Sequence, residues 1–133
     1  MTVPVWMLVG FAAWTMLLLL ATVGVYRWSR ILTGRVPIRS FRADQVEGAD
    51  WYKRAMRAHA NCVENLPVFG AIVFGLYVGN VTSTFVDALA VAVHVCFVQT
   101  NSVTSVRFGF FFVQIVSFLW LTGILLTQLS GSA

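Results

Sequence analysis

The feature of this chain that most limits its possible folds is a pair of long apolar runs that contain no charged residue. One extends from Thr2 to Tyr26 and the other from Phe108 to Leu129. A helix of about 20 apolar residues is long enough to cross the hydrocarbon core of a bilayer. Only 11% of the 133 residues are charged, whereas about a quarter is usual in a soluble domain. The chain is therefore predicted to be an integral membrane protein.

Two further apolar segments lie between these runs, and the four together predict an all-α fold, an integral membrane four-helix bundle. Asp87 and His94 interrupt the third segment, which makes it the least apolar, as suits a helix inside a bundle. Pro67 should kink the second by removing a backbone hydrogen bond. We expect one domain, residues 1–133, with spans at about residues 3–26, 58–78, 85–98 and 108–129.

The basic residues are concentrated in one connection, which predicts the orientation. Eight of the nine Lys and Arg lie between Arg27 and Arg57, and the ninth is Arg107. Short basic loops stay in the cytoplasm and can touch anionic lipid. We therefore expect the connection inside and both termini outside, with no role in nucleic-acid binding. The apolar amino-terminal run lacks the basic start of a cleavable signal peptide and is predicted to be retained.

Three polar residues near the cytoplasmic end of the second helix are candidates for a binding site. Arg57, Asn61 and Glu64 stand at spacings i, i+4 and i+7. At about 100° per residue they fall within roughly 60° of one helical face. Lipid offers such groups no hydrogen bonds, so they must face a partner helix, water or a ligand. A ligand site is the favoured interpretation, and hydrogen bonding between helices is the alternative.

The histidines and cysteines do not predict a metal site. His59 lies near the cytoplasmic end of its helix, whereas His94 lies 15 Å or more deeper by the rise of about 1.5 Å per residue. One iron could not reach both, and a zinc site that adds Cys62 and Cys96 would need side chains from nearly opposite helical faces. Neither cysteine has a cation on its helical face that would activate it as a nucleophile. An arginine that stabilises a bound anionic cosubstrate fits the composition better.

The run Arg57-Ala-His-Ala-Asn-Cys-Val-Glu-Asn-Leu-Pro67 resembles the second-helix pattern of the MAPEG family, the membrane-associated proteins in eicosanoid and glutathione metabolism. In that pattern an arginine is followed by asparagine four residues later, by glutamate three residues after that, and then by proline. The four-span layout, the basic first loop and Arg107 at the head of the fourth helix match as well. The chain resembles the microsomal glutathione transferases, as a bacterial-type member of the family in the inner membrane.

The resemblance implies a membrane glutathione transferase or peroxidase. It implies a homotrimer that binds glutathione as cosubstrate between subunits, near the cytoplasmic helix ends. Arg57, Asn61 and Glu64 would hold the charged ends of glutathione, and Arg107 would favour its thiolate, which attacks a lipophilic electrophile or hydroperoxide arriving from the bilayer. Two residues correspond to further glutathione contacts, His94 and Arg30.

One position departs from the family pattern. Four residues after His94, where prostaglandin-type members carry a tyrosine that contacts glutathione, this chain has Val98. The alternative function is therefore a non-catalytic membrane protein that uses the same bundle for binding or as a scaffold. Glutathione-dependent consumption of a reactive aryl halide distinguishes the two.

Overall fold

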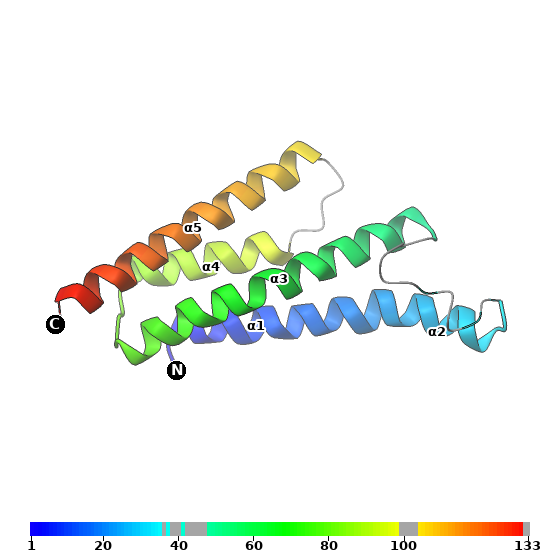
Figure 1. The fold of residues 1–133 in the computed structure, drawn as a ribbon, viewed down its shortest axis with the longest axis horizontal. Helices are drawn as coiled ribbons and strands as arrows, with labels where there is room; N and C mark the ends of the chain where they lie inside the picture. Colours follow the sequence, from blue (N-terminus) through cyan, green and yellow to red (C-terminus); the bar gives the residue numbers. More distant parts are fainter. Residues whose placement is uncertain (36, 38–40, 42–47, 99–103, 132–133) are drawn as a thin grey trace. The chain divides into compact units, whose positions relative to one another are not determined.

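The computed structural model describes residues 1–35, 37, 41, 48–98 and 104–131, and most of these residues are helical. No strand occurs within these ranges, so the all-α prediction is confirmed. Figure 1 follows the chain from its blue amino terminus through four helical segments to its red carboxyl terminus. The first segment combines α1 (Val3–Leu18), the π-helical η1 (Leu19–Gly24) and α2 (Val25–Leu32). The others are α3 (Asp50–Val78), α4 (Thr84–Val98) and α5 (Thr104–Gly131).

Three of the four segments are long and apolar enough to cross a membrane: Val3–Leu32, Asp50–Val78 and Ser105–Gly131. The exception is α4, with 15 residues, which rises about 22 Å against a hydrocarbon core of about 30 Å. A helix satisfies its own backbone hydrogen bonds, which lipid cannot do, and this explains why long apolar runs become helices. The chain is a multi-pass membrane protein.

The sequence Asp50-Trp51-Tyr52 predicts the start of a second helix ahead of the membrane span, and this start is confirmed. Asp50 opens α3, and its carboxylate lies where the positive end of the helix dipole stabilises a negative charge. The helix therefore extends about two turns beyond the predicted span on the side of the basic connection. It passes through Pro67 as one helix. Much of that connection, including Arg39 and Arg42, lies outside the described residues.

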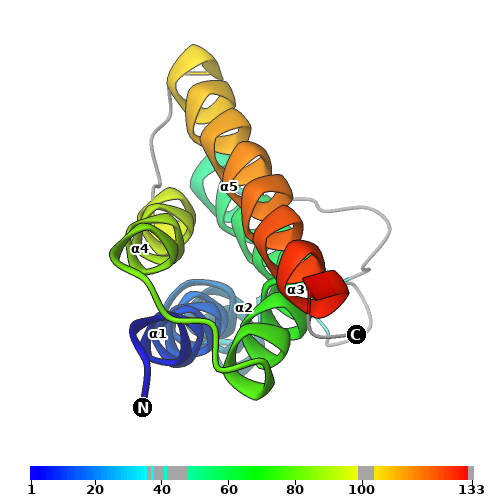
Figure 2. The ribbon, with the colours of Figure 1, turned by 90° about the vertical axis from the view of Figure 1, so that its left-hand side faces the viewer.

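The chain divides into two compact units, which are described separately here. One contains Met1–Ala12 and Glu64–Ala133. Within it α4 and α5 are antiparallel and in contact (Figures 1 and 2), and the ring of Phe85 packs edge-on against Trp120 with centroids 5.8 Å apart. The ring of Phe69 lies 6.1 Å from that of Phe11 and 5.9 Å from that of Phe118. These aromatic contacts join α1, α3 and α5 in the core of this unit.

The other unit, Ala13–Val63, is centred on stacked tyrosines. Val23, Tyr26 and Tyr52 form its buried cluster. The rings of Tyr26 and Tyr52 stack with centroids 4.1 Å apart, and Trp51 meets Tyr26 edge-on at 5.1 Å. Aromatic pairs in these geometries add to the stabilisation from burial alone. The cluster joins the end of the first helical segment to the beginning of α3.

Gly48 is required where the chain approaches this cluster before α3. Its φ of 137° is a conformation that residues with a side chain rarely adopt, and a Cβ there would lie 2.5 Å from the hydroxyl oxygen of Tyr26. The same hydroxyl accepts a hydrogen bond of 3.2 Å from the backbone N–H of Ala49. Glycine therefore allows the backbone to close over the tyrosine.

Candidate functional site

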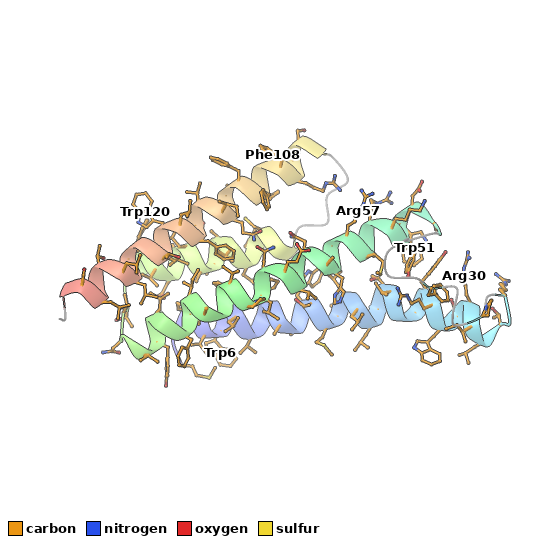
Figure 3. All side chains as sticks on the ribbon, in the orientation of Figure 1. Trp6, Arg30, Trp51, Arg57, Phe108 and Trp120 are labelled. Carbon is orange, nitrogen blue, oxygen red and sulfur yellow. The ribbon has the colours of Figure 1, made fainter. Side chains whose placement is uncertain are left out.

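The face of α3 that carries Arg57, Asn61 and Glu64 is accessible. Arg57 and Glu64 are exposed, and Asn61 is partly buried. Because α3 is helical throughout, the three side chains emerge within about two turns on one face. Figure 3 shows Arg57 in the amino-terminal part of α3, following Trp51. A cation, an amide and a carboxylate thus lie along one face of α3, as the spacing predicted.

A network around Arg27 fixes the part of α3 that presents Arg57. The Nε of Arg27 donates a hydrogen bond of 2.7 Å to the hydroxyl of Tyr52, and its Nη2 lies 3.8 Å from the sulfur of Met56. The guanidinium also lies over the ring of Phe41, 5.5 Å from its centroid. Hydrogen bonds from a charged donor are among the stronger ones in proteins. Arg27 is therefore a structural cation, distinct from the exposed Arg57.

Arg30 is held in place by an aromatic ring. Its guanidinium carbon lies 4.7 Å from the centroid of the Tyr26 ring, within the range of a cation–π interaction. Stacking on a ring face leaves the planar edge of a guanidinium able to bind a carboxylate. Arg30, Arg57 and Asn61 all belong to the unit Ala13–Val63.

His94 is positioned by a close approach to a glycine on another helix. An ideal Cβ on Gly10 would lie 3.0 Å from the Cε1 of His94 and 3.6 Å from each ring nitrogen. The Nδ1 atom is buried and has no hydrogen-bond partner among the described residues. The lack of a side chain at Gly10 therefore lets the imidazole pack against α1, and packing sets the ring position.

Arg107 stands in the first turn of α5 and is exposed. Its neighbour Phe108, labelled in Figure 3, is 68% exposed. Arg107, His94 and Glu64 belong to the same unit. The two units thus divide the six predicted site residues into two sets of three, and α3 carries members of both sets.

Gln114 is a polar residue that the sequence analysis missed. It is only 2% exposed, and its Nε2 has no hydrogen-bond partner among the described residues. Nearby hydroxyls behave differently, because Ser117 donates to the carbonyl of Val113 and Thr122 to that of Phe118, both at 2.8 Å. The predicted span 108–129 contains two amides, and Gln114, unlike Gln128, stands away from the end of the span, which was the available signal.

The two cysteines are free, and Cys62 is buried. A side-chain hydrogen bond joins Cys62 to Thr15. In the same unit, Trp14 Nε1 and His59 Nδ1 are buried without a hydrogen-bond partner among the described residues. The described part of the chain contains no group of three His, Cys, Asp or Glu side chains suited to a metal ion.

The π-helical turn η1 sets the direction of the residues that follow it. The hydroxyl of Thr22 donates to the carbonyl of Leu18 within this turn. A π-helical turn accommodates about one extra residue compared with α-helix. It therefore rotates the helix after Gly24 relative to the helix before Leu19, and so determines which way Tyr26, Arg27 and Arg30 point.

Comparison with protein families decides the relationship that the motif in α3 suggested. The model of the MAPEG family matches residues 4–127. The chain belongs to the MAPEG family. The match covers nearly the whole chain and includes all six predicted site residues, so the resemblance is confirmed at the level of the family. No curated protein and no solved structure matches this MAPEG protein.

Proposed function

We propose that this MAPEG protein is a membrane-bound glutathione transferase, with peroxidase activity towards lipophilic hydroperoxides. The observation that carries the proposal is the display of Arg57, Asn61 and Glu64 on successive turns of α3, with the two charged side chains exposed. Family membership supports it, because the family includes glutathione transferases.

The chemistry of the α3 face suits a zwitterionic peptide thiol. Glutathione carries two carboxylates and one ammonium. The Arg57 guanidinium pairs with a carboxylate, the Asn61 amide hydrogen-bonds to it, and the Glu64 carboxylate accepts from the ammonium. Arg30 and His94 make further polar contacts with the tripeptide. The cytoplasmic orientation of the basic connection gives this site access to cytosolic glutathione.

Arg107 supplies the catalytic charge. A free thiol has a pKa of about 8.5, so only a few per cent is ionised at neutral pH, and the thiolate is the nucleophile. A guanidinium beside the sulfur stabilises the thiolate. The thiolate then forms a C–S bond with an electrophilic carbon, whose leaving group departs with the bonding pair. With a hydroperoxide, the sulfur takes the terminal oxygen and the alkoxide leaves, and a second glutathione reduces the resulting sulfenic acid.

The functional assembly is a homotrimer in which neighbouring subunits complete each glutathione site. The exposure of Arg57, Glu64 and Arg107 in the single chain supports this assembly, because ionised groups in a membrane protein are expected to face a partner or ligand.

The test is Glu64→Gln, studied by calorimetric titration with glutathione and by size exclusion in detergent. We expect binding to weaken by about 1.5–3 kcal/mol, the contribution of a hydrogen bond to a charged group, with assembly intact. Asp87→Asn, a change of the same chemistry in the first turn of α4, is the matched control and should leave affinity unchanged. Normal affinity of an intact Glu64→Gln assembly would reject the site. Binding lost only together with assembly would assign Glu64 to hydrogen bonding between helices, the alternative interpretation of this residue.

A further inference from the structure

The two compact units of the chain differ strongly in charge. The unit Ala13–Val63 contains eight Lys and Arg against three Asp and Glu, whereas the rest of the chain contains one cation, Arg107, and two carboxylates. Asp50 is the only carboxylate among the described residues of the basic unit. This unit therefore presents positive charge that its described carboxylates do not neutralise.

Two cations of this unit have no role in the site or its support. Arg27 supports α3 through a hydrogen bond, and Arg30 and Arg57 belong to the proposed glutathione site. Lys53 and Arg54 do neither. They follow one another in the first two turns of α3, where Lys53 is partly buried and Arg54 is exposed.

The start of α3 lies at the level where the hydrocarbon core meets the lipid headgroups. Trp51 is exposed and meets Tyr26 edge-on, with ring centroids 5.1 Å apart. Tyr26 ends the charge-free run that begins at Thr2. Beyond it on α2, Trp28 and Leu32 are exposed as well. Exposed tryptophans at the end of an apolar run are typical of the membrane–water interface, so the junction of α2 and α3 is expected in the headgroup layer.

Arg54 and Trp51 combine a cation and an apolar ring at this level. Three residues separate them, so their side chains lie on one face of α3. Side chains on a helix lean towards its amino terminus, which directs the Arg54 guanidinium back towards Trp51 and the headgroups. Guanidinium and ammonium groups form strong hydrogen bonds with phosphate oxygens, and an interfacial indole packs beside the acyl chains. A ligand with both a phosphate and an apolar part matches this face.

We propose that Lys53 and Arg54 bind the phosphate of an anionic phospholipid, next to the ring of Trp51. The lipid class follows from charge, because a zwitterionic headgroup brings its own ammonium into a unit that already has excess positive charge. Each Lys or Arg close to an anionic lipid surface strengthens binding about fivefold. The two cations together therefore favour an anionic over a zwitterionic lipid by about thirtyfold.

The test is native mass spectrometry of the detergent-solubilised protein, titrated with phosphatidylglycerol and separately with phosphatidylcholine. The parent should bind the first phosphatidylglycerol about thirtyfold more tightly than the first phosphatidylcholine, and Arg54→Gln should reduce this preference about fivefold. Arg54→Lys keeps the charge and should retain most of the preference. The affinity for phosphatidylcholine should be the same in all three proteins, which distinguishes loss of a charge contact from loss of structure.

The matched control is Arg107→Gln, which removes one exposed arginine from the other unit and should leave the preference unchanged. Equal losses in Arg54→Gln and Arg107→Gln would mean that the overall charge of the protein attracts the lipid, and would overturn the proposal. An unchanged preference in Arg54→Gln would overturn it too. Displacement of phosphatidylglycerol by water-soluble glycerol phosphate would assign these cations to a soluble anion and would also reject the lipid site.

Discussion

Replacing Gly10 by alanine would test the contact that positions His94. The added methyl carbon would lie 3.0 Å from Cε1 of His94, whereas ordinary contacts begin at 3.4 Å, so the ring must retreat by about 0.4 Å or more. Overfilling a packed interior costs about 1–3 kcal/mol. Alanine is better than glycine within a helix by about 0.5–1 kcal/mol. We therefore expect Gly10→Ala to lower the free energy of unfolding by about 1–2 kcal/mol.

A double-mutant cycle isolates the contact from the intrinsic effect of alanine. In a His94→Ala background the added methyl meets no imidazole, so Gly10→Ala should become stabilising by about 0.5–1 kcal/mol. The coupling energy between the two positions should therefore be about 1–3 kcal/mol. The measurement is unfolding of the four proteins by SDS in mixed micelles.

The control for this cycle is Gly123→Ala on α5, where an added Cβ has nothing within 4 Å. It should show no coupling to His94→Ala. An equal effect of Gly10→Ala in both backgrounds would mean that His94 does not pack against α1, and the account of the His94 position would be wrong.

Two further predictions concern the anchoring of α3 and the orientation of the chain. Tyr52→Phe removes the acceptor of the 2.7 Å hydrogen bond from Arg27 and should destabilise the protein by about 1–3 kcal/mol. The control Tyr77→Phe, at a ring that is 60% exposed, should have almost no effect in the same SDS titration. Equal effects of the two substitutions would mean that the bond from Arg27 does not stabilise α3. Thr33→Cys should react with a membrane-impermeant maleimide only after the cells are opened to expose the cytoplasmic face, whereas Thr82→Cys should react in intact cells. The parent protein, labelled in the same way, is the control. The reverse pattern would mean that the predicted topology is inverted.

The helices were predictable because their cause is local. Lipid admits only segments that satisfy their own backbone, so the charge-free run Thr2–Tyr26 had to be helical. Asp50 marked the start of α3 through its charge at the helix amino terminus. The π-helical turn at Leu19–Gly24 was not predictable, because its residues also fit an α-helical span.

The site was predictable only where it lies on one helix. Periodicity relates Arg57 to Glu64 because α3 is continuous, but it cannot relate residues on different helices. The contact between Gly10 and His94 depends on how α1 meets α4, which neither segment encodes alone. The amide of Gln114 is visible in the sequence, but the absence of a partner among the described side chains emerges only when the chain is folded.

The most direct test of the central claim is the ultraviolet absorbance of the glutathione thiolate on the purified protein at neutral pH. Adding glutathione to the parent should produce a thiolate signal that saturates with binding. Arg107→Ala should still bind glutathione by calorimetry but lose most of this signal and most of the turnover, and raising the pH should restore part of both as the thiol ionises unaided. Arg107→Lys should retain an intermediate signal. A folded Arg107→Ala protein that binds glutathione with the parent's thiolate signal and rate would contradict the account, as would a parent that binds glutathione only as the thiol.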